Sequence, residues 1–212
     1  MEFIRARSDK QKNMRLNQIV SAALELYETT TFDKITLAAI AERLDFTRAN
    51  LYKYVSSKEE IYLLVISRDF EAFVQDILEH FKDTKNMTIE KFAWQWSEIL
   101  FRHERLLQLF SVLFTLIEKN VSARSLAVFK KQMFIDIGKL KPMFLQLLPD
   151  MAVEQIHPFL NIQLHYAIGL YPSTTLNDIQ QEAIRISEVP YKVEDFVSAF
   201  ASFSIVILRG LF

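Results

Sequence analysis

The sequence predicts an all-α fold of about nine to ten helices, because apolar residues recur every three or four positions along most of the chain. Only three glycines and five prolines occur among 212 residues, too few for turn-rich β architectures or glycine-rich phosphate loops. No cysteine is present, which excludes disulfides and thiolate metal sites and favours a cytoplasmic location. No apolar run approaches the roughly 20 residues that cross a bilayer, so no membrane partner is expected.

The first helix is predicted over residues 16–27, where apolar side chains recur at spacings of three and four. Three threonines at positions 29–31 end it, because β-branched hydroxyl residues favour a turn. The first 20 residues carry five basic and two acidic side chains, although the whole chain has a formal net charge of −1. This local excess suits a terminus that meets phosphate, or one that is simply solvated.

Two short helices follow, and a threonine is predicted to cap each of them. Thr36 precedes a periodic stretch that ends at Leu44, and Thr47 precedes a second one that runs through Tyr54. Only Asp45 and Phe46 separate the two stretches, so the turn is short. The apolar positions that hold the pair together are Leu37, Ile40, Ala41, Leu44, Phe46 and Leu51.

Ser56 or Ser57 is predicted to cap a fourth, longer helix that reaches Phe81, and Thr88 marks the next start. The later helices are predicted over residues 88–100, 106–117, 122–148, 153–170, 176–187 and 193–211. Pro142 is expected to kink one of them, while Pro149, Pro172 and Pro190 separate helices. The domain boundary is placed near the start of the fourth helix, giving domains over residues 1–60 and 61–212.

Two short helices joined by a three- or four-residue turn form a helix-turn-helix, whose second helix enters the DNA major groove. The stretch from Thr36 to Tyr54 fits that description. Its outward set suits base edges, since Arg pairs with guanine, Asn with adenine, and Ala touches the thymine methyl. That set is Arg48, Ala49, Asn50, Tyr52 and Lys53. The side chains suited to phosphate oxygens are those of Thr36, Thr47, Tyr52, Tyr54 and Lys58. Double-stranded operator DNA is therefore the expected partner.

The run ITLAAIAERL at positions 35–44, continued by Phe46-Thr47, by NLYKY at 50–54 and by KEEI at 58–61, resembles the N-terminal signature of the tetracycline-repressor (TetR) family. The resemblance covers about the first third of the chain. It implies that Thr47 caps the recognition helix and that Tyr52, Tyr54 and Lys58 bind phosphate. It also implies that Arg48, Ala49, Asn50 and Lys53 face the bases.

Departures from the family pattern occur in and around the motif. Asp45 stands where the family usually has glycine in the turn, and it can enter the left-handed region at some cost. Thr31 replaces a second glycine, Val55 stands where an aromatic residue is commoner, and Tyr54 where histidine is commoner. None of these residues breaks the helical pattern.

The resemblance further implies a C-terminal ligand-binding and dimerisation domain, and a repressor that a small hydrophobic or aromatic effector releases from a palindromic operator. Helices 153–170 and 193–211 carry apolar residues on more than one face, as expected of a homodimer interface. No cofactor is expected. The candidate ligand contacts are Phe92, Trp96, Phe101, His103, Phe110, Phe114, Phe134, His165 and Tyr166. Each of these residues is also a candidate for ordinary core packing.

Two alternatives belong to other functional classes. A helical protein-interaction module would carry the same polar set from Arg48 to Lys53 as a solvated face. A helical-bundle metal enzyme is suggested by Glu154 and His157, which are three residues apart as in di-iron proteins. The second such pair that this chemistry needs is missing, so neither an enzyme nor a metal site is expected.

Overall fold

The computed structural model describes the backbone of residues 2–211 and the side chains of residues 11–211. Within that range the chain forms ten α-helices and no strand, which confirms the all-α prediction. It divides into two compact units, Met1–Arg68 with Phe114–Lys131, and Asp69–Leu113 with Gln132–Phe212. Most of the basic side chains predicted near the N-terminus lie outside the described residues.

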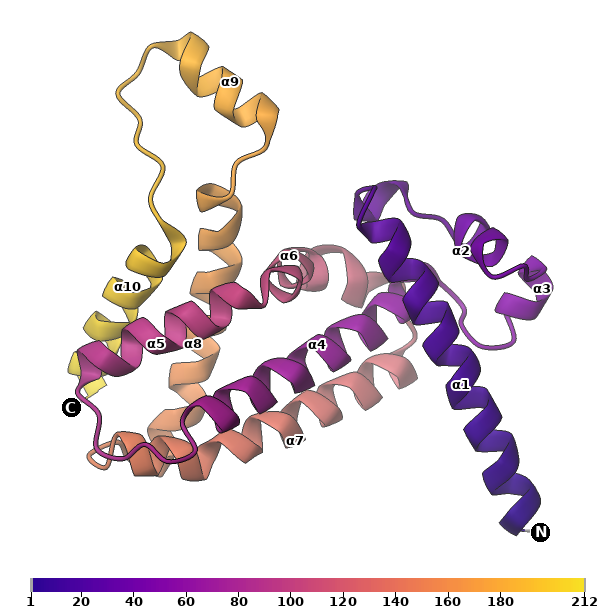
Figure 1. The fold of residues 1–212 in the computed structure, drawn as a ribbon, viewed down its shortest axis with the longest axis horizontal. Helices are drawn as coiled ribbons and strands as arrows, with labels where there is room; N and C mark the ends of the chain where they lie inside the picture. Colours follow the sequence, from indigo (N-terminus) through magenta and orange to yellow (C-terminus); the bar gives the residue numbers. More distant parts are fainter. Residues whose placement is uncertain (1, 212) are drawn as a thin grey trace. The chain divides into compact units, whose positions relative to one another are not determined.

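The first unit contains the helices of the predicted DNA-binding region (Figure 1). Its elements are α1 (Glu2–Tyr27), the 3-10 turn Phe32–Lys34, α2 (Leu37–Arg43), α3 (Arg48–Leu51), the start of α4 (Lys58–His80), the 3-10 turn Glu118–Asn120 and the start of α7 (Ala123–Leu147). Tyr62 of α4 is fully buried at the centre of this unit. Its ring lies edge-on to Phe32 at 4.8 Å, and its hydroxyl donates to the Ala23 carbonyl at 3.3 Å. Burial raises the pKa of Tyr62 well above its ordinary value.

Glu60 joins the start of α4 to the start of α7 inside the first unit. Its carboxylate accepts from the backbone N–H and hydroxyl of Ser56, at 2.9 and 2.8 Å. It also accepts from the hydroxyls of Ser122 and Ser125, at 3.2 and 2.7 Å. Burial alone would raise the pKa of Glu60, but these hydrogen bonds outweigh it and lower the pKa. Residues 114–131 are thereby tied to the N-terminal helices.

The second unit is a helical bundle with an aromatic core. It comprises the rest of α4 and α7, together with α5 (Ile89–Arg102), α6 (Glu104–Val112), α8 (Val153–Thr174), α9 (Asp178–Ser187) and α10 (Phe196–Leu211). Helix α10 packs against α5 and α8, and α6 packs against α8. Phe92 and Trp96 of α5 stack at 5.6 Å, and Phe144 of α7 lies 5.6 Å from both rings.

Most predicted helices are confirmed, and the differences lie at their ends. Ser57 caps α4 through the Glu60 N–H, and Thr88 caps α5 through the Lys91 N–H. The helix predicted over 106–117 begins earlier, at Glu104, and its last residues, Leu113–Ile117, form a π-helical rather than an α-helical turn. Helix α8 continues past Pro172 to Thr174 rather than ending at 170, since a proline in the last turn removes only one hydrogen bond. Helix α10 begins at 196 rather than 193, because Asp195 accepts from the Ser198 N–H at 2.8 Å.

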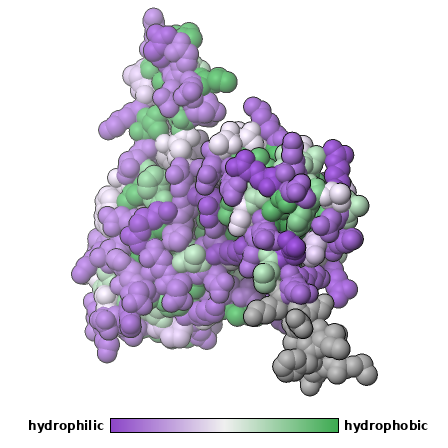
Figure 2. Space-filling model, turned by 45° about the vertical axis from the view of Figure 1, so that its right-hand side comes forward, coloured by the Kyte–Doolittle hydropathy of each residue, from purple (hydrophilic) through white to green (hydrophobic). Residues whose placement is uncertain are grey.

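Helix α9 buries none of its residues within the second unit. It lies beyond the ends of α8 and α10 in Figure 1, and Figure 2 shows apolar side chains on this segment at the top of the view. Ile179 and Ile186 are 82% and 66% exposed. Among the described residues, no helix is long and apolar enough to cross a membrane.

Candidate nucleic-acid interface and ligand cavity

The reading head, by which we mean residues 36–54, is built on two threonine caps. The Thr36 side chain accepts from the Ala39 N–H at 3.2 Å, and the Thr47 side chain accepts from the Asn50 N–H at the same distance. Both predicted caps are therefore confirmed. The Asn50 N–H also donates to the Thr47 carbonyl at 2.9 Å, so two groups of Thr47 hold the start of α3, a helix of only four residues.

The turn between α2 and α3 passes through Asp45, whose φ of 56° lies in the left-handed region. This conformation confirms the prediction for the residue that replaces the usual glycine. The Phe46 N–H then donates to the Ala41 carbonyl at 2.9 Å and closes the turn. Thr31, at the other missing glycine, has a φ of −79°, so this chain needs no glycine there.

The predicted DNA contacts lie on the outside of the reading head, around the buried Leu51. Tyr52 is 57% exposed although it is a large aromatic residue. The exposed members of the predicted set are Thr36, Thr47, Arg48, Ala49, Tyr52 and Lys53, and the half-buried ones are Asn50, Tyr54 and Lys58. An exposed tyrosine beside an arginine and a lysine is typical of a surface that binds phosphate and bases.

An open groove lies between α1 and the end of the reading head. It is lined by Gln11, Lys12, Met14, Arg15, Gln18, Lys53 and Tyr54. Three of these residues are cationic and none is acidic. The Arg15 guanidinium stands over the Phe46 ring at 5.4 Å and donates to the Gln18 side chain at 2.8 Å. Lys12 and Arg15 belong to the basic N-terminal stretch for which the sequence left open a phosphate contact or a solvated terminus.

Lys58 has internal partners that the sequence did not indicate. Its ammonium donates to the carbonyls of Phe32 and Asp33, at 2.8 and 3.1 Å, and lies 4.6 Å from the centre of the Phe32 ring. An ammonium has three donors, so one remains for another acceptor. Its predicted phosphate contact therefore has to coexist with a structural role in the turn after α1.

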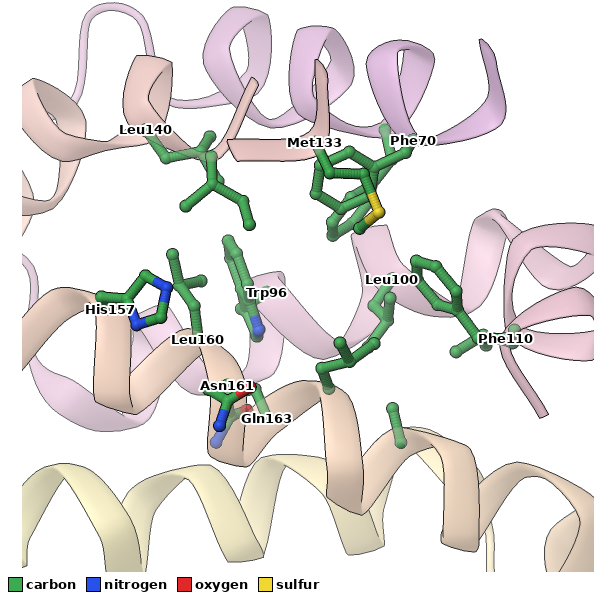
Figure 3. Close-up of a pocket in the computed structure, with 15 residues that line it drawn as sticks. Phe70, Trp96, Leu100, Phe110, Met133, Leu140, His157, Leu160, Asn161 and Gln163 are labelled. Atoms are coloured by element: carbon green, nitrogen blue, oxygen red, sulfur yellow. The ribbon is translucent and has the colours of Figure 1, made fainter. Parts of the chain in front are cut away.

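A cavity of about 90 Å³ lies inside the second unit, between α4, α5, α6, α7 and α8 (Figure 3). Its apolar wall consists of Phe70, Phe73, Trp96, Leu100, Leu107, Phe110, Met133, Ile137, Leu140, Leu160, Leu164 and Ala167. Its remaining lining residues are His157, Asn161 and Gln163 of α8. Figure 3 shows the indole nitrogen of Trp96 on the side of the ring that faces Asn161 and Gln163.

Of the nine predicted ligand contacts, the structure places Trp96 and Phe110 on this cavity. Phe92 is fully buried in the adjacent core, and Phe101 stacks on Phe196 at 5.3 Å near the surface. Tyr166 stacks on Phe203 at 3.7 Å. These three residues do not line the cavity, and neither do the remaining four. His103 lies edge-on to Phe73, and Phe134 is 67% exposed beside His157. Phe114 belongs to the first unit, and His165 is exposed.

Two buried nitrogen atoms that belong to cavity-lining residues have no hydrogen-bond partner among the described residues. They are the indole Nε1 of Trp96 and the amide Nε2 of Gln163, in side chains that are 2% and 3% exposed. The other end of the Gln163 amide lies 2.7 Å from the Ser204 hydroxyl of α10, whose single proton is shared between this oxygen and the Phe200 carbonyl at 2.8 Å. Sequence reasoning missed Gln163, although a glutamine within an apolar helix was a signal.

A cluster of charged residues joins the end of α5 to α4 in the second unit. Arg102 and His103 both contact the Asp76 carboxylate, at 3.0 and 3.1 Å. Burial would raise the pKa of Asp76, but these two partners outweigh it and lower the pKa. Across the described residues, no group of three or more His, Cys, Asp or Glu side chains is placed to hold a metal ion.

A capped pair of short helices followed by a second helical unit is the architecture of a helix-turn-helix transcriptional regulator. A family model described as bacterial regulatory proteins, tetR family, matches residues 19–65. A second, described as tetracyclin repressor-like, C-terminal domain, matches residues 67–212. The chain therefore belongs to the TetR family of bacterial transcriptional regulators.

The chain is similar to solved structures at low sequence identity, and one of those reported below has a TM-score above 0.5. The fatty acid degradation regulator FadR from Bacillus halodurans is 10% identical, with 92% of this chain and 94% of that chain covered and a TM-score of 0.55. A TetR/AcrR family regulator from Thermobifida fusca YX-ER1 is 18% identical, with 90% and 96% covered and a TM-score of 0.48. A transcriptional regulator from Aquifex aeolicus VF5 is 17% identical, with 93% and 99% covered and a TM-score of 0.47. No curated protein sequence matches the chain.

Proposed function

We propose that this protein is a cytoplasmic, homodimeric repressor that binds a palindromic operator and is released from it by a small hydrophobic effector. The observation that carries the DNA-binding part is the reading head. Its two caps hold a short helix whose exposed face is polar, and a cationic groove adjoins it. The interaction-module alternative accounts for the polar face but not for three cations lining one groove without an acid.

In this proposal the exposed residues divide into two roles. Arg48, Ala49, Asn50 and Lys53 meet base edges, where each good bidentate pair gives about 1–3 kcal/mol of discrimination. Phosphate oxygens are held by Tyr52, Tyr54, the threonine caps Thr36 and Thr47, and the free donor of Lys58. Lys12 and Arg15 extend the phosphate contacts along α1.

A fluorescence-anisotropy titration against the DNA upstream of its own gene, over a salt series, tests DNA binding. The variants Tyr52→Phe and Lys53→Gln remove one hydroxyl and one charge from exposed positions. Lys141→Gln, which removes an exposed charge from the second unit, is the matched control. Lys53→Gln is expected to weaken binding and, because it removes one positive charge from the interface, to make the salt dependence less steep. Equal weakening by Lys141→Gln, or no binding to any fragment including random genomic pools, contradicts the proposal.

Dimerisation is proposed through the outward faces of α8 and α10. Val206 of α10 is 67% exposed, Ile162 of α8 is 38% exposed, and a Cβ added at Gly169 or Gly210 would meet nothing within 4 Å. These small and apolar positions allow close approach of a second copy. A two-fold dimer would present two reading heads to half-sites about 34–36 Å apart, or a multiple of this spacing.

Light scattering after gel filtration tests the dimer. Val206→Glu is expected to yield monomers, because it places a charge in the interface. Val128→Glu is a matched control, since Val128 on α7 is 66% exposed. A dimer that survives Val206→Glu but not Val128→Glu would place the interface elsewhere.

The effector is proposed to occupy the cavity of the second unit. A concave, mostly apolar space with a few polar groups is the usual form of a small-molecule site. Binding there would release DNA only if the ligand prefers the conformation in which the reading heads no longer fit adjacent grooves.

A further inference from the structure

The unpaired nitrogens of Trp96 and Gln163 define what kind of molecule the cavity accepts. This inference rests on the proposed effector site and concerns the chemistry of its ligand. Both side chains are more than nine-tenths buried, and both line the same cavity. Buried N–H groups without a partner are uncommon in folded proteins and cost about 1–3 kcal/mol each. Two of them in side chains that line one cavity point to an acceptor that arrives with a ligand.

The indole N–H of Trp96 can only donate a hydrogen bond, so the ligand group that meets it must be an acceptor. The Gln163 amide has both a donor and an acceptor end. Turning it over would pair its nitrogen with Ser204 and put its oxygen where the nitrogen now lies. The ligand must therefore carry an acceptor for Trp96, with Gln163 as a second, adaptable contact.

The lining also determines the charge of the ligand. No lysine, arginine, aspartate or glutamate is among the residues that line the cavity, and its polar lining residues besides Trp96 are His157, Asn161 and Gln163. A buried ammonium would lack a counter-charge there, and a carboxylate would have one only in a protonated His157, so either charge is costly in this mainly apolar surrounding. A neutral molecule avoids this cost.

The volume limits the size of the ligand. At about 90 Å³ the cavity is smaller than an engineered cavity of about 150 Å³ that binds benzene. Met133 lies in its wall, and a methionine side chain can adopt other rotamers to admit a somewhat larger group.

We propose that the cavity binds a compact, neutral and mainly apolar carbonyl compound, such as a small cyclic ketone or aldehyde, whose oxygen accepts a hydrogen bond from Trp96. Gln163 contacts the same oxygen or its neighbour. The apolar body of the ligand lies against the rings of Phe70, Phe73 and Phe110.

Three probes of similar shape test the proposal: cyclopentanone, methylenecyclopentane and cyclopentanecarboxylate. Calorimetry on the full-length protein measures their affinities for wild type and for Trp96→Phe, which keeps an aromatic ring but removes the N–H. The ketone and the alkene differ in solubility, so the informative quantity is the change in their affinity ratio between the two proteins. Trp96→Phe is expected to weaken the binding of the ketone about tenfold relative to the binding of the alkene. Trp94→Phe, at a 43% exposed position of the same helix, is the control and should leave the ratio unchanged.

Nuclear magnetic resonance gives a second readout that does not depend on a folded Trp96 variant. The protein has two tryptophans, so its ¹⁵N spectrum has two indole signals, which Trp94→Phe assigns. Cyclopentanone should shift the Trp96 signal, whereas the alkene should not shift it in the same direction. An unchanged affinity ratio in Trp96→Phe, or tighter binding of the carboxylate than of the ketone, overturns the proposal. A Trp96 indole signal that none of the three probes shifts also overturns the proposal.

The DNA titration on the same preparations separates this inference from the proposed function. If the protein binds operator DNA but the ketone-to-alkene affinity ratio is the same in wild type and Trp96→Phe, only the ligand assignment is refuted. If that ratio changes in Trp96→Phe but the protein binds no DNA, only the regulatory role is refuted.

Discussion

Replacing Gln163 with leucine should not destabilise the protein, although the residue is only 3% exposed between packed helices. The two side chains are close in volume, so the substitution mainly removes polar atoms. It relieves one unpaired amide nitrogen, worth about 1–3 kcal/mol, and loses one hydrogen bond to Ser204, worth about 1 kcal/mol. Ser204 keeps its bond to the Phe200 carbonyl at 2.8 Å. The free energy of unfolding is therefore expected to stay level or rise by up to about 2 kcal/mol.

Urea unfolding followed by circular dichroism measures this change, and a thermal melt should rise by roughly 2–4 °C for each kcal/mol gained. Ser204→Ala provides the contrast, because it leaves the Gln163 oxygen unpaired as well and should lower the free energy of unfolding by about 1–3 kcal/mol. The two partners of one hydrogen bond are thus predicted to respond with different signs. A loss of more than about 1 kcal/mol in Gln163→Leu would refute the reasoning, because the amide nitrogen would then have to be satisfied in the folded protein.

Three further predictions concern the caps, the turn and acid stability. Thr47→Ala should cost about 1 kcal/mol of unfolding free energy and weaken DNA binding, whereas Thr47→Ser, which keeps the cap, should leave the urea midpoint almost unchanged. Asp45→Ala should cost about 1 kcal/mol because alanine is strained at a φ of 56°, while Asp45→Asn should be nearly neutral; equal midpoints for the two would contradict the strain argument. The pKa of Asp76 is lowered in the folded state, so the stability that it contributes is present above its ordinary value of 3.8 and disappears as the pH falls below that value. The difference between wild type and Asp76→Asn should therefore shrink in acid melts below about pH 4, and a difference that grows there would show the opposite linkage.

The sequence predicted the reading head well because its signals are local. A cap bonds to a backbone N–H three residues away, so Thr36 and Thr47 could be recognised without knowing what the helices pack against. The left-handed turn at Asp45 is local in the same sense. The Asp195 cap of α10 is local too, but apolar residues continue on its N-terminal side at Val193, so periodicity alone places the helix start too early.

The cavity was predicted poorly because its walls come from five helices. Periodicity shows which face of a helix is buried, but not which other helix covers that face. Phe92 and Trp96 lie four residues apart on α5 and share its buried face, yet only Trp96 lines the cavity. For the same reason the sequence predicts ligand contacts for Phe134, which is exposed, and for Phe101, which stacks on Phe196 near the surface. Aromatic content alone therefore could not separate core residues from cavity residues.

Helix α8 connects the two parts of the proposed mechanism. One face of it carries Gln163 and Ala167 toward the cavity, and another carries Ile162 and Gly169 toward the proposed dimer interface. Gln163 is also hydrogen-bonded to Ser204 of α10, the second helix of that interface. Because a helix moves as a nearly rigid rod, a ligand that draws Gln163 toward itself would shift the outward face of α8 as well. Linkage then requires that DNA weaken ligand binding by the same factor by which the ligand weakens DNA binding, which makes the coupling measurable from either side.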